Sequence, residues 1–102
     1  MSLNVLDVNH LTWRHSNFAN GVWVKDLGVS DGYAMQLVKF EPGAFFPKHQ
    51  HDKAEFIYIL KGELIQNGYS LQQGFVSISD PKSIDQTVAS PNGCEFLLLS
   101  AA

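Results

Sequence analysis

Short hydrophobic runs, separated by turn residues, recur along the chain from residue 21 onward. Glycine, proline and the pairs Asn-Gly and Asp-Gly return every few residues, and the runs between them are rich in Val, Ile, Phe, Tyr and Leu. This rhythm favours an all-β sandwich or barrel. The predicted strands are residues 22–25, 33–40, 45–48, 55–61, 63–66, 69–71, 75–79, 86–89 and 94–100. No segment has a convincing helical pattern.

One hairpin and one irregular segment complete this outline. The pair Asn67-Gly68 separates two strand-like runs, and Asn-Gly supplies the two positive φ angles of a tight type I′ turn. Residues 1–20 have no clear period although they contain Trp13 and Phe18. We therefore expect a single domain over residues 1–102, in which residues 1–20 are an N-terminal arm that packs on the barrel.

Composition narrows the function classes. The chain has 102 residues, a net charge of −3 and only 17% charged residues, against about 25% in typical proteins. The positive charges form no basic run, which argues against nucleic acid as a partner. No apolar run approaches the ~20 residues of a membrane span, and the first ten residues do not resemble a signal peptide. The single cysteine, Cys94, excludes an intrachain disulfide, and these features together favour the cytoplasm.

The candidate chemistry lies in residues 43–62. His49 and His51 are two apart, so on an extended strand their side chains point to the same face and can hold one metal ion. Glu55 follows after a three-residue turn and opens the next strand, where its carboxylate can reach the same ion. Two histidines and a carboxylate form a facial arrangement that leaves positions open for water or substrate.

This segment resembles the first motif of the cupin family. In that motif a glycine is followed by five residues, His-x-His, three or four residues, Glu, six residues and a glycine. Gly43, His49, His51, Glu55 and Gly62 match every fixed position and spacing. The resemblance implies a cupin-type double-stranded β-helix, also called a jelly-roll barrel. It also implies a divalent metal ion such as Fe, Mn, Zn or Ni.

The second cupin motif is poorly kept. Its strict spacing would put a third histidine ligand at Ser77, and no histidine follows position 51. The best substitutes by chemistry are Asp85 and, next to it, Gln86. Three alternatives remain open at this point. Asp85 replaces the histidine, or the ion has three protein ligands and extra waters, or the metal site has decayed.

A narrower resemblance spans roughly residues 13–98. Trp13, the segment 37–44 and the Asn92-Gly93-Cys94 turn look like ChrR-type cupins. That group includes the metal-binding lobe of zinc-dependent anti-sigma factors and stand-alone cupins, and acetylacetone-cleaving dioxygenases are similar. The sigma-binding lobe of those factors is a separate helical domain for which this chain has no room. An anti-sigma role is therefore not implied.

Strand alternation predicts which residues line a pocket and which face outward. If His49 and His51 point inward, Phe45 points inward too. If Glu55 points inward, Ile57 does as well. We expect the pocket to be lined by Met35, Phe45, Ile57 and Gln86.

The opposite face of residues 55–61 is also apolar, with Phe56, Tyr58 and Leu60. A half-exposed strand should carry polar residues there. The arm or a second subunit is therefore expected to cover it, and a homodimer is predicted.

The sequence leaves three functions in competition. The first is a small metal-dependent enzyme, of the dioxygenase or isomerase type, acting on a small organic molecule. The second is a non-catalytic cupin that binds or senses a metal or metabolite. The third is a metal-free structural cupin.

Overall fold

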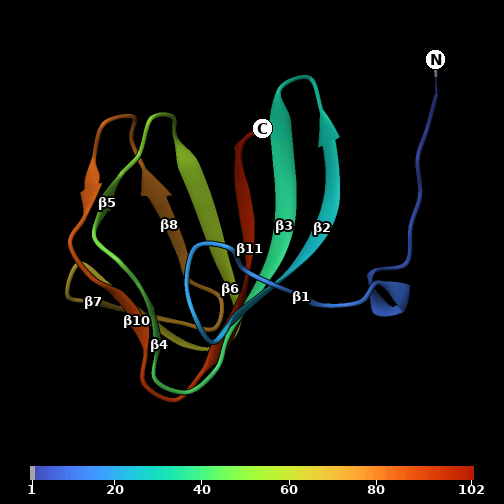
Figure 1. Cartoon of the computed structure of the whole chain (residues 1–102). Coiled ribbons are helices and arrows are strands. Elements are labelled where there is room, and N and C mark those ends of the chain that lie inside the picture. Colours follow the sequence, from blue (N-terminus) through green and yellow to red (C-terminus); the bar gives the residue numbers. More distant parts are fainter. Residues whose placement is uncertain (1) are drawn as a thin grey trace.

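The computed structural model describes residues 2–102, which are almost entirely strands and turns (Figure 1). The elements are η1 (Val8–His10), β1 (Arg14–His15), β2 (Val22–Ser30), β3 (Tyr33–Phe40), β4 (Ala44–Phe46), β5 (His49–Gln50), β6 (Glu55–Gln66), β7 (Tyr69–Gln72), β8 (Val76–Ser79), β9 (Ile84–Asp85), β10 (Val88–Ser90) and β11 (Cys94–Ala101). The predicted all-β class is confirmed.

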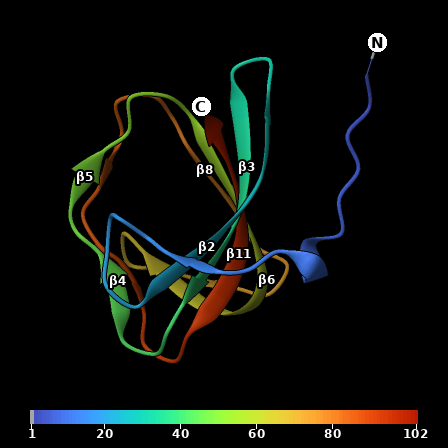
Figure 2. The ribbon, with the colours of Figure 1, turned by 45° about the vertical axis from the view of Figure 1, so that its right-hand side comes forward.

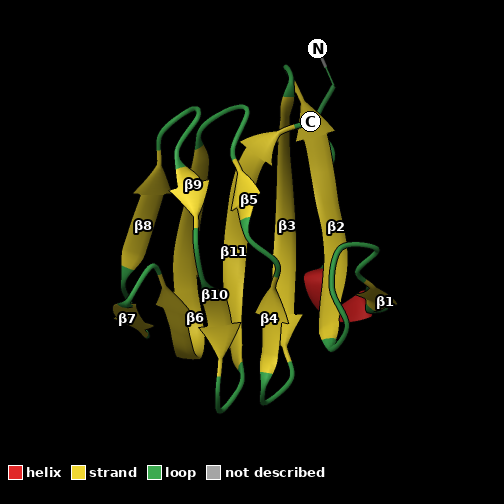
Figure 3. Cartoon of the chain, turned by 60° about the vertical axis from the view of Figure 1, so that its left-hand side comes forward, coloured by secondary structure: helices red, strands yellow, loops and turns green. Residues whose placement is uncertain are grey.

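The strands pair in one long, curled antiparallel sheet and one short ribbon. The sheet has the order β1-β2-β3-β11-β6-β10-β4, with β7 and β8 also paired to β6. The short ribbon joins β5 to β9. The long strands β2, β3, β11 and β6 form one wall, and β4, β5, β9 and β10 lie opposite it (Figure 3). The centre of the molecule therefore lies between two layers of strands, as in a jelly roll.

Two tight hairpins set the register of the long strands. Asn67 and Gly68 both have positive φ, and Gln66 pairs with Tyr69 across them, which confirms the predicted type I′ turn. Asp31 and Gly32 also have positive φ, between the paired residues Ser30 and Tyr33. The second hairpin joins β2 to β3.

The hydrophobic core fills the space between the layers. Its most deeply buried members come from β2, β3, β6 and β11: Val22, Val38, Phe40, Ile59, Leu64 and Phe96. On β3 and β11 these core positions alternate with residues of the outer face, as the pleat requires.

The N-terminal segment packs on the outside of β2 and β3 over part of its length. Residues 2–7 extend away from the sheet (Figure 2) and are exposed. The Trp13 ring lies over the ammonium groups of Lys25 and Lys39, at 4.9 and 4.4 Å from its centroid. Lys25 Nζ also donates to the Val8 carbonyl oxygen at 3.0 Å. These contacts cover one edge of the outer face.

The rest of that outer face remains apolar and open. The register aligns Met35, Leu99, Phe56 and Ile78 in one row across β3, β11, β6 and β8. The adjacent outward row is Leu37, Leu97, Tyr58 and Val76. Of these, Met35, Phe56, Tyr58, Val76 and Ile78 are each more than 40% exposed. Among the described residues, no helix is long and apolar enough to cross a membrane.

Candidate metal centre and adjoining cleft

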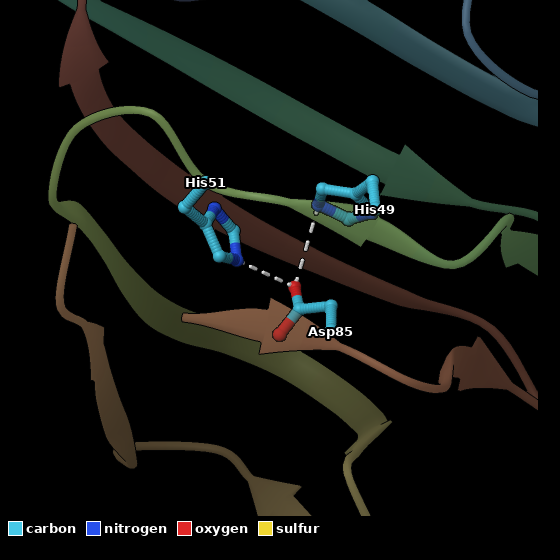
Figure 4. A group of neighbouring side chains, drawn as sticks. All are labelled: His49, His51 and Asp85. Atoms are coloured by element: carbon cyan, nitrogen blue, oxygen red, sulfur yellow. Dashed lines mark ion pairs between the residues drawn. The ribbon is translucent and has the colours of Figure 1, made fainter. Parts of the chain in front are cut away.

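The short β5·β9 ribbon brings together three side chains with metal-binding atoms. His49 on β5 lies directly opposite Asp85 on β9. The ladder continues past β5, because His51 N–H donates to the Ser83 carbonyl oxygen at 2.9 Å. Residues two apart on a strand share a face, so both imidazoles and the carboxylate lie on one side of the ribbon. Figure 4 shows the three side chains converging.

The distances within this cluster suit one shared ion. The ligand atoms of His49, His51 and Asp85 all lie within 4.8 Å of one another. Asp85 Oδ2 lies 3.0 Å from His51 Nε2 and 3.5 Å from His49 Nε2, the two contacts dashed in Figure 4. Metal ligands about 2 Å from a common ion lie about 3 Å from one another, so the spacing needs little adjustment.

Two buried ring nitrogens of the cluster have no hydrogen-bond partner. Asp85 and His51 are both buried, and neither ring nitrogen of His51 makes a hydrogen bond. Buried polar atoms are rarely left in this state, because removing them from water costs about 1–3 kcal/mol each. A cation bound at His51 Nε2 would remove one of these two deficits.

His49 is already oriented for such a role. Its Nδ1 lies 2.9 Å from the Pro47 carbonyl oxygen, which can only accept a hydrogen bond. Nδ1 therefore carries the proton, and Nε2 presents its lone pair toward Asp85. A backbone carbonyl that fixes the tautomer in this way is typical of metal-binding histidines.

Asp85 is held by amide groups from the adjacent β-hairpin. Gln66 Nε2 donates to Oδ1 and Oδ2 of Asp85 at 3.1 and 3.2 Å. Asn67 Nδ2 donates to Oδ1 at 3.4 Å. Ser77 Oγ in turn donates to Gln66 Oε1 at 2.7 Å. The carboxylate is thereby fixed with Oδ2 toward the imidazoles.

Glu55 lies beside the cluster rather than within it. Its Oε1 is 3.4 Å from His51 Nδ1, which is the ring nitrogen that does not face Asp85. Its side chain is 30% exposed, whereas that of Asp85 is 5% exposed. Glu55 therefore borders both the cluster and the solvent-accessible space next to it.

That space is a cleft of about 500 Å³ between the two layers. His49 and Glu55 lie at its polar end, and Phe18 packs edge-on against both Phe46 and His49, with ring centroids 4.9 and 5.2 Å apart. The remaining lining residues come from the N-terminal segment and from β1, β2, β3 and β11: Arg14, Ser16, Asn17, Val24, Gln36, Val38 and Leu98.

The cleft differs from the lining that the sequence predicts. Phe45 is 62% exposed because Pro47 and Lys48 interrupt the strand between β4 and β5, so the alternation does not carry through to His49. Phe46 faces inward instead. Met35 points to the outer face and Ile57 belongs to the core. Gln86 lines a separate surface hollow together with Phe45.

An ion pair lies on the far side of the cleft, where Arg14 is a lining residue. Arg14 Nε and Nη2 donate to the two carboxylate oxygens of Asp26 at 2.6 and 2.9 Å, and Gln36 Nε2 donates to Asp26 Oδ1 at 2.9 Å. These hydrogen bonds, with that from Arg14 as the largest cause, lower the pKa of Asp26 to about 2. The Asp26 carboxylate is therefore ionised at neutral pH and paired with the arginine.

The remaining two histidines and the cysteine are not members of the cluster and do not line the cleft. His10 is exposed, and His15 stacks on Trp23 with ring centroids 3.6 Å apart. Cys94 is a buried core residue, and burial raises the pKa of its thiol. A thiol in that state is a poor nucleophile.

The sequence predicts His49, His51 and Glu55 as ligands and offers Asp85 as one of three alternatives, but it does not indicate which residues support Asp85. It predicts Gln66 as the end of a strand and Asn67 as a turn residue. One signal was available. Gln66 shares the inward face of its strand with apolar residues, and a buried amide there requires hydrogen-bond partners.

Comparisons with known proteins agree with the fold. A family model described as the ChrR cupin-like domain matches residues 2–101. No curated protein sequence matches the chain.

Solved structures resemble the chain closely in shape and weakly in sequence. The polyketide cyclase RemF from Streptomyces resistomycificus has a TM-score of 0.88 at 13% identity, covering 98% of this chain and 80% of that one. An acetylacetone dioxygenase from Acinetobacter johnsonii has a TM-score of 0.81 at 13% identity, covering 99% and 74%.

A complex of Rhodobacter sphaeroides SigE with the anti-sigma ChrR has a TM-score of 0.79 at 20% identity, covering 92% of this chain and 50% of that one. The chain thus spans half of that neighbour. Identities this low show the fold alone, and the predicted cupin-type double-stranded β-helix is confirmed.

Proposed function

Because the chain belongs to the ChrR cupin-like family, we propose that it binds one divalent metal ion through His49, His51 and Asp85. One observation carries this proposal. The buried His51 ring has no hydrogen bond at either nitrogen, although its Nε2 lies 3.0 Å from a buried carboxylate oxygen. A cation bound between His51 Nε2 and Asp85 Oδ2 would give each of these two atoms a partner.

The donor set narrows the choice of ion. Two imidazoles and a carboxylate suit Fe, Mn, Zn or Ni. Three protein ligands leave coordination positions open. Glu55 is the further candidate, since its carboxylate borders the cluster and the cleft. It can complete the ligand set or exchange a proton with a bound molecule.

The cleft favours an enzyme over a structural protein. It opens directly onto His49 and Glu55, so a small organic molecule bound there would lie next to the ion. We propose a reaction of the dioxygenase or isomerase type, in which the ion would act as a Lewis acid. A cupin that senses a metal or metabolite without turnover is the alternative. Turnover at an open coordination position would favour the enzyme, and tight binding with full ligation would favour the sensor.

Metal content tests the proposal directly. Protein purified without a chelating column is expected to contain close to one divalent ion per chain, measured by elemental analysis. Added metal should raise the melting temperature, and the double variant His49→Ala/His51→Ala should lose both effects. The matched control is His10→Ala/His15→Ala, which removes two histidines outside the cluster. If the wild-type protein carries no metal and Fe, Mn, Zn and Ni leave its melting temperature unchanged, the proposal is wrong.

We further propose that the outer sheet face pairs two copies of the chain. The two aligned rows across β3, β11, β6 and β8 contain only apolar and tyrosine side chains. The next outward row contains Lys39, Glu95 and Lys61, so charges of both signs border the apolar area. In a two-fold dimer the same surface of both subunits meets, so the positive charges of one border can face the negative charges of the other. The low charge content of the chain supports the same view.

A further inference from the structure

We propose that the cleft selects an uncharged small molecule, because the carboxylate of Asp26 neutralises Arg14, the one lining residue on its far side that carries a positive charge. This inference rests on the proposed function, since it names the class of molecule that the cleft beside the metal centre takes.

The walls of the cleft are mostly apolar. Phe18, Phe46, Val24, Val38 and Leu98 line it and come from five different segments. Such walls favour a molecule with a hydrocarbon or aromatic body, because its apolar surface is removed from water on binding.

The Arg14 guanidinium is paired with a carboxylate through its Nε and Nη2 groups. It makes two parallel hydrogen bonds to Asp26, the geometry in which arginine would otherwise grip the carboxylate of a ligand. Gln36 uses its amide donor on the same carboxylate, which helps to hold Asp26 in place. An anionic ligand would compete with Asp26 for the charge of Arg14, and a cationic ligand would meet Arg14.

The charges at the other end also balance. A divalent cation held by two neutral imidazoles would be offset by the carboxylates of Asp85 and Glu55. Both ends of the cleft are then close to neutral, so neither leaves an excess charge for an ionic ligand to compensate. The uncharged polar groups of Asn17 and Gln36 remain on the lining. They suit a neutral oxygen or hydroxyl group.

Three single-ring probes of similar size and different charge test this inference. Acetophenone is neutral, benzoate is an anion and benzylamine is a cation at pH 7. Zinc-loaded protein is titrated with each probe, and binding is followed by the methyl NMR signals of Val24, Val38 and Leu98. Acetophenone is expected to shift these signals in a saturable way, at least 10-fold more tightly than either ion.

The variant Asp26→Asn separates charge from shape. It keeps an oxygen for Arg14 and leaves the guanidinium charge uncompensated, so the affinity for benzoate should rise about 3- to 5-fold. The control Asp31→Asn removes the same charge at the β2–β3 turn, outside the cleft lining, and should leave benzoate binding unchanged.

Three outcomes would overturn the inference. The first is benzoate or benzylamine binding the wild-type protein as tightly as acetophenone. The second is that no probe shifts the cleft signals, and the third is an equal response of benzoate to both aspartate variants. Zinc binding is measured separately by calorimetry, so failure of the metal site is distinguished from failure of the charge selection.

Discussion

A single buried amide connects the site of an expected histidine to the carboxylate of the cluster. Ser77 stands where the strict cupin spacing predicts a third imidazole, and its hydroxyl donates to Gln66 Oε1. That bond decides which end of the amide faces Asp85, so both Nε2 contacts to the carboxylate follow from it. Asp85 lies on a different strand from Ser77. Its support therefore passes through a third element, β6.

We predict that Gln66→Met weakens metal binding about 10- to 100-fold, the usual cost of losing an outer partner of a metal ligand. Methionine has a similar volume but cannot hold the Asp85 carboxylate. Zinc affinity is measured by chelator competition, and the visible spectrum of the cobalt-loaded variant reports altered ligand geometry. The control is Gln72→Met, on the exposed side of β7. Zinc affinity within 2-fold of wild type, with an unchanged cobalt spectrum, would show that Gln66 does not position Asp85.

The residue scale also shows where sequence reasoning succeeds and fails. His49 and His51 were predictable because two residues at strand spacing must share a face. Asp85 was predictable only as an acid in the right region. The prediction pointed Phe45 inward, whereas Phe46 is the inward residue. The irregular Pro47–Lys48 link between β4 and β5 breaks the alternation that the prediction assumed. Gln66 and Asn67 required the three-dimensional pairing of distant segments.

At the scale of elements, strand β6 ties the core to the candidate site. It begins at Glu55, ends at Gln66 and pairs with β7, β8, β10 and β11. Gly62 interrupts it with a φ of +77°, and a Cβ added there would lie 2.3 Å from the Gly93 carbonyl oxygen. The last glycine of the motif is therefore required by the close crossing of β6 and the turn before β11.

We predict that Gly62→Ala lowers the free energy of unfolding by at least about 2 kcal/mol, from the disfavoured φ and the clash with backbone atoms together. The matched control is Gly28→Ala on β2, where φ is not positive and the added Cβ meets no atom within 4 Å. That variant should stay within about 0.5 kcal/mol of wild type. Urea denaturation of the metal-free proteins measures both. Equal stability of the two variants would contradict the argument.

Two of the long elements were predictable, whereas β2 was predicted only over residues 22–25 and the very short strands were missed. The run 33–40 was predicted with its observed bounds, and the runs 55–61 and 63–66 proved to be one strand that continues through Gly62. The two-residue strands β1, β5 and β9 are too short to show a period. Two of these three form the ribbon that carries the cluster, so the topology of the site could not be read from local patterns.

At the scale of the whole molecule, one exposed sheet face is apolar where charged residues would be expected, which accounts for part of the low charge content. The sheet face with Met35, Phe56, Tyr58, Val76 and Ile78 carries large side chains that are each more than 40% exposed. The N-terminal segment covers the neighbouring edge near Lys25 and Lys39 and leaves these five uncovered. Contiguous apolar patches of this kind mark interaction sites in proteins.

A homodimer through this face predicts that charge placed in its centre separates the subunits. Wild-type protein at micromolar concentration is expected to show the mass of a dimer in light scattering, and Tyr58→Glu that of a monomer. The ionised carboxylate would have to be desolvated against the apolar row of the partner, which costs several kcal/mol.

The control Tyr69→Glu makes the same change on the exposed β7 strand, which lies outside the two apolar rows, and should remain dimeric. A monomeric wild-type protein, or a Tyr58→Glu variant that stays dimeric, would reject this interface. Because the metal cluster faces the interior and the apolar rows face outward, the monomeric variant should still bind metal with wild-type affinity.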